Sequence, residues 1–242
     1  MTTGTLFGIG VGPGDPDLIP IKAVRILKQV DIVFTASSTK NDYSLAAEIA
    51  DAHIPENTRI EKMAFPMRKN EMVMKEAWRR NAGRIAEVLE SGCNAAFLTL
   101  GDPLTYSTYG YIVRFLKAGW PHLAISTIPG ITSYQAAAAA INRPLVEGEE
   151  SLLIMSGVHG GDQFQKMSVK PDNVVFLKAY RNVDGICHAL RKAEMIAGSV
   201  AVSNCSKENQ TIYTDLELLG QQQPNYWTLI IANHDSSDVM KE

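Results

Sequence analysis

Three short segments combine glycine with acidic or hydroxyl side chains at the ends of apolar runs. They are Gly8–Pro16 (GIGVGPGDP), Thr99–Ser107 (TLGDPLTYS) and Ile128–Ser133 (IPGITS). Glycine has no Cβ, so its backbone can approach a ligand closely, and open α/β sheets bind ligands beyond the carboxyl ends of their strands. The three segments are therefore candidate parts of a ligand site, although each also fits an ordinary turn or helix cap.

The first segment does not match the common nucleotide-binding motifs. Counting from Gly8, the sixth position of a dinucleotide fingerprint is Pro13, and counting from Gly10 it is Asp15, where glycine is required in both cases. The second strand is expected to end near Ala36, without the acidic residue that holds the ribose of NAD. No Gly-Lys-Ser or Gly-Lys-Thr follows the glycines, so a nucleoside triphosphate P-loop is excluded as well.

The elements that must position these segments alternate along the chain, which indicates an α/β fold with mainly parallel sheets. Strands are expected near 5–10, 31–35, 94–100, 123–128, 151–155, 173–177, 199–202 and 227–232, and helices near 21–29, 44–52, 71–90, 107–117, 132–140 and 184–192. The clearest helix is 71–90, whose apolar residues Trp78, Ala82, Ile85 and Leu89 recur at helical spacing. The strand spacing changes after about residue 123, and we therefore expect two α/β domains, 1–123 and 124–242.

Charge is unevenly distributed over the 242 residues, whose net charge is −3. The segment from Arg59 to Arg84 holds eight basic and three acidic residues and is +5, which leaves −8 for the rest. The overall balance gives no attraction to nucleic acid or to a membrane surface, while the basic segment is either a solvated helix face or an anion site. The three glycine segments contain no lysine or arginine that would contact an anion.

Cysteine and histidine usage predicts neither a disulfide framework nor a metal site. Cys93, Cys187 and Cys205 are far apart, which suits a reducing compartment, and no two of the five histidines have helical metal-ligand spacing. No apolar run approaches the ~20 residues that span a bilayer, and no basic stretch precedes the first glycines as in a signal peptide. We expect a cytoplasmic protein without a metal ion.

Taken together and in this order, the three glycine segments resemble those of the tetrapyrrole (cobalamin-type) methyltransferase family. The resemblance extends over nearly the whole chain. It implies two α/β domains that hold S-adenosylmethionine (SAM) in a cleft between them, with the tetrapyrrole on the side of the N-terminal domain. It also implies a homodimer and S-adenosylhomocysteine (SAH) as the second product.

Further segments are similar to the C-20 methyltransferases of cobalamin biosynthesis, which act on precorrin-2 or cobalt-factor II. They are Phe65-Pro66-Met67, Gly101–Tyr109 and Pro144–Gly148. In the uroporphyrinogen branch of the family a catalytic aspartate ends the second strand, whereas Ala36 occupies that position here. Alternatives are methylation of another corrin carbon, diphthine synthase on the same fold, or a non-catalytic protein that binds SAM or a tetrapyrrole.

The resemblance also implies roles for individual residues. Contacts to SAM are expected from Pro13, Gly101, Asp102, Thr105, Thr132, Ser133 and Leu177. Removal of the proton from the methylated meso carbon requires a base or a water relay, and Asp102 and Tyr106 are the candidates, although Asp102 could instead order its loop. A further expectation rests on charge and position alone. Arg68 and Lys69 precede the helix at 71–90, and we expect them to bind carboxylates of the tetrapyrrole.

Overall fold

The computed structural model describes residues 2–38, 44–66, 70–222 and 224–234 and divides into two compact units, Met1–Thr132 and Ser133–Glu242. The first unit therefore continues past the boundary expected at residue 123. The reason is that the strand Ala124–Ile128 pairs with the first strand of the chain, Thr5 with Ala124 and Ile9 with Ile128. Among the described residues, no helix is long and apolar enough to cross a bilayer.

The first unit is built on one parallel sheet of five strands in the order β3-β2-β4-β1-β5. The strands are β1 (Thr5–Gly10), β2 (Ile32–Ser38), β3 (Arg59–Phe65), β4 (Ala95–Thr99) and β5 (Ala124–Ile128). Because all five run in the same direction, the glycine segments after β1, β4 and β5 begin at the same edge of the sheet.

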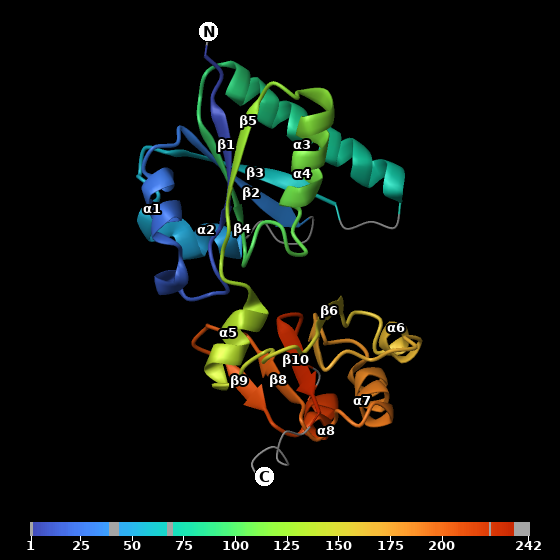
Figure 1. Ribbon diagram of the computed structural model, residues 1–242. Coiled ribbons are helices and arrows are strands. Elements are labelled where there is room, and N and C mark those ends of the chain that lie inside the picture. The colour runs from blue at the N-terminus through green and yellow to red at the C-terminus, as the bar shows by residue number, and fades with distance from the viewer. Residues whose placement is uncertain (1, 39–43, 67–69, 223, 235–242) are drawn as a thin grey trace. The chain divides into compact units, whose positions relative to one another are not determined.

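Helices cover both faces of this sheet, as the alternation of strands and helices along the chain predicts (Figure 1). One face packs against α1 (Ile21–Leu27) and α2 (Leu45–Ala50), and the other against α3 (Glu71–Glu90) and α4 (Tyr109–Gly119). Short 3-10 turns lie at Pro16–Leu18 and Asp51–His53. Two hydrophobic clusters, one on each face, fix the sheet that carries the glycine segments.

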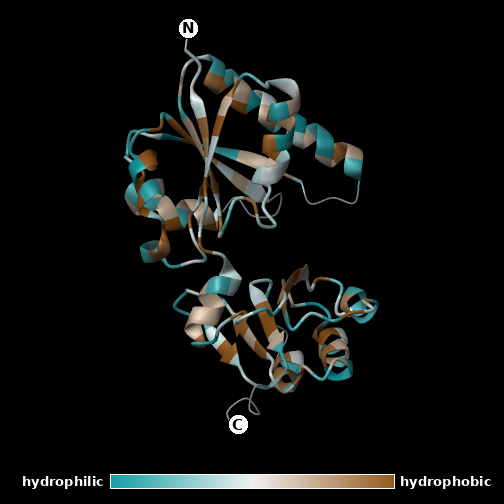
Figure 2. Cartoon of the chain, in the orientation of Figure 1, coloured by the Kyte–Doolittle hydropathy of each residue, from teal (hydrophilic) through white to brown (hydrophobic). Residues whose placement is uncertain are grey.

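Helix α3 has the boundaries that the sequence predicts, and its predicted apolar stripe is largely correct. Ala82, Ile85 and Leu89 are fully buried, whereas Trp78 is half-buried and stacks on Tyr111 of α4 at 3.9 Å between ring centroids. Hydrophilic residues share α3 with this stripe (Figure 2). The aromatic stack thus helps hold α3 against α4.

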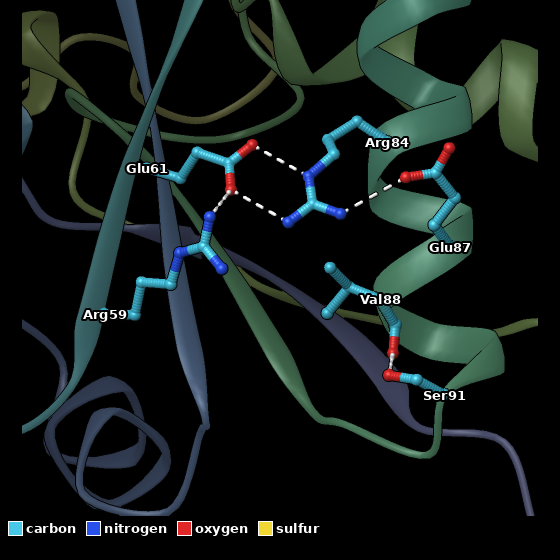
Figure 3. Close-up of polar contacts among 6 residues, drawn as sticks. All are labelled: Arg59, Glu61, Arg84, Glu87, Val88 and Ser91. Atoms are coloured by element: carbon cyan, nitrogen blue, oxygen red, sulfur yellow. Dashed lines mark hydrogen bonds and ion pairs between the residues drawn. The ribbon is translucent and has the colours of Figure 1, made fainter.

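Strand β3 is absent from the sequence-based expectation because charged residues interrupt its apolar pattern. Only Met63 and Phe65 are buried in it. Its Glu61 accepts hydrogen bonds from Arg84 of α3, 3.0 Å from Nε to Oε1 and 3.1 Å from Nη2 to Oε2, while Arg59 donates to the same Oε2 at 3.0 Å (Figure 3). Part of the basic segment is therefore an ion-paired surface that joins β3 to α3.

The second unit contains a five-stranded sheet in the order β6-β7-β10-β8-β9. Its strands are β6 (Leu152–Ser156), β7 (Asn173–Leu177), β8 (Val200–Ser203), β9 (Thr211–Tyr213) and β10 (Thr228–Asn233). Only β6 and β7 pair in parallel, and the other three pairings are antiparallel. The α/β class is confirmed, but the expectation of mainly parallel pairing applies to the first sheet alone.

Within 133–222 and 224–234, four helices accompany the second sheet. They are α5 (Ser133–Ala140), α6 (Asp162–Gln165), α7 (Val183–Lys192) and α8 (Leu216–Gln221). The last three contribute Phe164, Ile186 and Leu219 to one hydrophobic cluster with the strands. The short helices α6 and α8 have no counterpart in the sequence-based expectation, because four to six residues are too few to show a helical period.

Candidate functional site

Backbone hydrogen bonds join the segments that follow β1 and β4 in the first unit. The Gly101 amide donates to the Gly12 carbonyl at 2.7 Å, and the Gly12 amide donates to the Gly101 carbonyl at 3.4 Å. Val11 extends the contact by donating to the carbonyl of Thr99 at 3.0 Å. Two of the three glycine segments are thus joined directly to each other by backbone hydrogen bonds.

The third segment joins them through glycines that touch one another. A Cβ added to Gly130 would lie 2.2 Å from the Gly101 carbonyl oxygen, and one added to Gly10 would lie 2.5 Å from the same oxygen. No side chain fits at such distances, so Gly10 and Gly130 are required by the packing of the protein itself. All three segments meet at the carboxyl edge of the first sheet.

Gly101 is glycine for a different reason. Its φ is +69°, in the left-handed region, while a Cβ placed on it would meet only ordinary contacts, 3.8 Å from the Ile131 oxygen and 3.9 Å from the Thr132 Cα. The space beside its Cα is therefore not filled by protein atoms. Among Gly8, Gly10, Gly12, Gly101 and Gly130, Gly101 is the one at which an added Cβ would meet no atom closer than 3.8 Å.

Asp102 uses both carboxylate oxygens to hold these segments in place. Its Oδ1 accepts hydrogen bonds from the Leu104 amide at 2.9 Å and from Thr105 Oγ1 at 3.1 Å. Its Oδ2 accepts from the Gly130 amide at 3.2 Å. The carboxylate therefore orders its own turn and ties it to the third segment.

The rest of the second segment turns outward after Asp102. Tyr106 has a left-handed φ of +51° and a side chain that is 55% exposed, and Leu104 is 68% exposed. Ser107, predicted to cap the following helix, accepts from the amide of Tyr109 at 3.1 Å. The turn thus presents two large side chains to its surroundings next to the space beside Gly101.

Tyr109 ends the segment Gly101–Tyr109 and packs under the first glycine segment, a structural role that the sequence did not predict. Its ring is fully buried and lies against Gly8, where an added Cβ would be 2.1 Å from the ring carbon Cζ. Its hydroxyl lies 3.0 Å from Thr127 Oγ1 on β5. Burial raises the pKa of this phenol, so the group stays neutral. The signal in the sequence was Gly8, whose missing side chain makes room for the ring.

The other predicted residues divide between the two units. Pro13 is buried and follows the bridged Gly12, and Thr132 is buried next to Gly101. Ser133 begins α5 and Leu177 ends β7, both in the second unit, where the Leu177 carbonyl accepts from the Gly157 amide at 2.6 Å. Arg68 and Lys69 lie outside the described residues.

The chemistry available at the three segments is that of backbone amides and carbonyls with two carboxylates, Asp15 and Asp102, and several hydroxyls. Over residues 2–38, 44–66, 70–222 and 224–234, no three His, Cys, Asp or Glu side chains are grouped as metal ligands. Such a surface suits an uncharged or zwitterionic ligand that is recognised largely through the backbone.

Comparison with known proteins agrees with this geometry. Residues 5–219 match the family described as Tetrapyrrole (Corrin/Porphyrin) Methylases. The chain belongs to this family. The family membership that the three glycine segments predict is therefore confirmed.

Two relatives of this methylase carry the same functional name. A probable cobalt-precorrin-2 C(20)-methyltransferase of Methanocaldococcus jannaschii is 37% identical, over 72% of this chain and 71% of the relative. A cobalt-precorrin-2 C(20)-methyltransferase of Salmonella typhimurium is 27% identical, over 95% of this chain and 96% of the relative.

A solved structure shares the fold of the methylase. It is the uroporphyrin-III C-methyltransferase of Thermus thermophilus complexed with S-adenosylhomocysteine, with a TM-score of 0.70 and 23% identity, covering 95% of this chain and 92% of that one.

Ala36 of this methylase lies inside β2 rather than at its end. It pairs with Met63 of β3 and packs against the hydrophobic cluster beneath α3 and α4. The chain therefore offers no carboxylate at this position, in keeping with the sequence-based argument against uroporphyrinogen III.

Proposed function

We propose that the chain transfers the methyl group of SAM to C-20 of precorrin-2 or its cobalt complex in the biosynthesis of cobalamin. The observation that carries the proposal is the shared name of the two relatives, both C(20)-methyltransferases, of which one matches 95% of this chain. The sequence features Ala36 and Gly101–Tyr109 point to the same branch. Methylation at another corrin carbon and diphthine synthesis have no comparable support.

The space beside Gly101 is where we place the methyl donor. Bound SAM supplies an electrophilic methyl group on sulfur, so the protein needs no nucleophile of its own and acts by positioning, which can contribute roughly 7–11 kcal/mol. Gly101, Thr105 and Thr132 border this space or the turn next to it. We propose that they contact SAM together with Pro13, and that Ser133 and Leu177 do so from the second unit.

Methylation of a meso carbon also requires that its proton be removed. Asp102 and Tyr106 remain our candidates for the group that receives the proton, directly or through water. The three hydrogen bonds that Asp102 accepts favour a different role for it, ordering of the turn. Tyr106 is exposed beside it and able to face a substrate. Arg68 and Lys69 are proposed to bind the carboxylates of the tetrapyrrole.

Two further proposals concern the oligomeric state and the cellular location of the protein. We propose a homodimer, as the family resemblance implies. We also propose a cytoplasmic location, because Cys93, Cys187 and Cys205 are all free thiols and suit a reducing compartment. Sedimentation of the purified protein and fractionation of the producing cell test the two statements.

The deciding experiment is incubation with methyl-labelled SAM and either precorrin-2 or cobalt-factor II, followed by NMR of the product. We expect one labelled methyl group at C-20 and one equivalent of SAH. Label at C-2, C-7, C-11 or C-17 would contradict the assignment to C-20 but not the family. Binding of both ligands without release of SAH would instead identify a non-catalytic binding protein.

A further inference from the structure

An unbroken cluster of aromatic rings and cations lies in the second unit. The cluster, here called the aromatic–cation cluster, consists of Lys178, Tyr180, Arg181, Lys207, Tyr226 and Trp227. The Tyr226 ring makes edge contacts with Tyr180 and Trp227, at 5.4 and 5.0 Å between centroids. A cation lies over each ring, with Lys178 Nζ 5.5 Å from the centre of Tyr226.

The strand order explains why these residues meet. Strands β7 and β8 are both antiparallel to β10, which lies between them, so their carboxyl ends share an edge with the beginning of β10. Lys178 directly follows β7, Lys207 lies beyond β8, and Trp227 directly precedes β10 (Figure 1). The Asn204 amide donates to the Trp227 carbonyl at 3.2 Å and fixes this edge.

Three cations of the first unit have electrostatic partners that differ from those of the cluster. Arg59, Arg84 and Lys75 all form ion pairs with glutamates. Within the described part of the chain, neither Lys178 nor Arg181 forms an ion pair, and each lies over a tyrosine ring instead. A cation over an aromatic face keeps its charge available to an incoming anion.

We propose that the aromatic–cation cluster binds the carboxylate rim of the tetrapyrrole, with Lys178 and Arg181 on the carboxylates and the 42% exposed Trp227 against an apolar part of the ligand. The inference rests on the proposed function. A precorrin carries several carboxylates on a broad apolar ring, and aromatic rings next to the cations Lys178 and Arg181 match both properties. Lys178 also directly follows Leu177, a predicted SAM contact, so donor and acceptor would meet at the end of β7.

The test uses the full chain with SAM and cobalt-factor II, comparing Lys178→Gln and Arg181→Gln with wild type. Loss of a charge-assisted hydrogen bond should raise KM for the tetrapyrrole by roughly tenfold at low salt, with less effect at high salt. The Kd of SAH should stay unchanged. Lys178→Arg, which keeps the charge, should restore a KM near that of wild type, whereas a merely structural lysine gives no such charge dependence.

Lys166→Gln is the matched control, because Lys166 is exposed in the same unit and contacts no aromatic ring that the structure describes. Values of KM for both cluster variants equal to that of Lys166→Gln would overturn the inference. A weakened Kd for SAH in the cluster variants would also overturn it, because the cations would then hold SAM. Failure of the wild type to methylate cobalt-factor II or precorrin-2 would count against the proposed function instead.

Discussion

At the residue scale, the motif glycines have two different physical causes. Gly10 and Gly130 have no room for a Cβ because the Gly101 carbonyl oxygen lies against both. Gly101 has room, and only its left-handed φ excludes most side chains. Substitution of Gly10 or Gly130 therefore disturbs folding, whereas Gly101 allows the ligand site to be tested without breaking the fold.

We predict that Gly101→Asn folds normally but loses affinity for SAH by tenfold or more. Asparagine tolerates a left-handed φ at low cost, its Cβ would meet only ordinary contacts, and its amide group would project into the space proposed for SAM. The measurement is calorimetric titration of SAH together with the thermal midpoint. Gly92→Asn is the control, since Gly92 also has a positive φ but follows α3, at the opposite end of β4. Unchanged affinity in Gly101→Asn would place the SAM site elsewhere.

Asp102 shows how much of the candidate site can be predicted from the sequence at the scale of single residues. Its motif and its position after a strand could be predicted from the order of the residues, and its place in a ligand site stays a prediction. Its hydrogen bond to the Gly130 amide, 28 positions away, could not, because it depends on how two segments approach in space. The same is true of Tyr109 at the start of α4, whose contact with Gly8 joins this helix to β1, far away in the sequence.

At the scale of elements, prediction succeeded where a strand or helix shows its own period and failed where charge masks it. Helix α3 was predicted to the residue, but β3 was missed, since the ion pairs of Glu61 place charge on a strand with only two buried side chains. Likewise, apolar runs located the strands of the second unit but carry no information on their direction. The antiparallel direction of β10 depends on its pairing with β7 and β8, which its own residues do not reveal.

The contact between Glu61 and Arg84 gives a prediction for acid stability. The hydrogen bond from Arg84 lowers the pKa of Glu61, against a smaller opposing effect of burial. A carboxylate with a lowered pKa stabilises the fold above its unfolded pKa, about 4.3, and loses this contribution as the pH falls through its folded pKa. We expect Glu61→Gln to cost about 1 kcal/mol of unfolding free energy at pH 7 and much less near pH 3.

Urea unfolding of the wild type and Glu61→Gln at several pH values measures this difference. The side chains of Glu61 and Arg84 are only 23% and 34% exposed, so salt should screen their contact incompletely. Glu71→Gln is the control, because Glu71 forms an exposed pair with Lys75 within α3 and should have a smaller effect. A stability difference that persists unchanged at pH 3 would contradict the role assigned to the Glu61 carboxylate.

At the scale of the whole molecule, the chain divides after Thr132 and not at residue 123, because β5 completes the first sheet and its carboxyl end supplies the third glycine segment. A change in strand spacing marks the region of a boundary but not which sheet a strand joins. The consequence is that all three glycine segments up to Thr132 belong to one unit, while Ser133 and Leu177 belong to the other.

This division predicts how SAH should affect hydrogen exchange along the chain. If SAM is contacted from both units, as proposed, SAH will slow exchange of the amides at 101–107 in the first unit and at 177–179 in the second, because bound ligand opposes local opening. The turn at 91–94, which joins the end of α3 to the start of β4 at the opposite edge of the sheet, serves as the reference. Slowed exchange at 101–107 with none at 177–179 would confine the donor to the glycine segments and remove Leu177 from the SAM contacts.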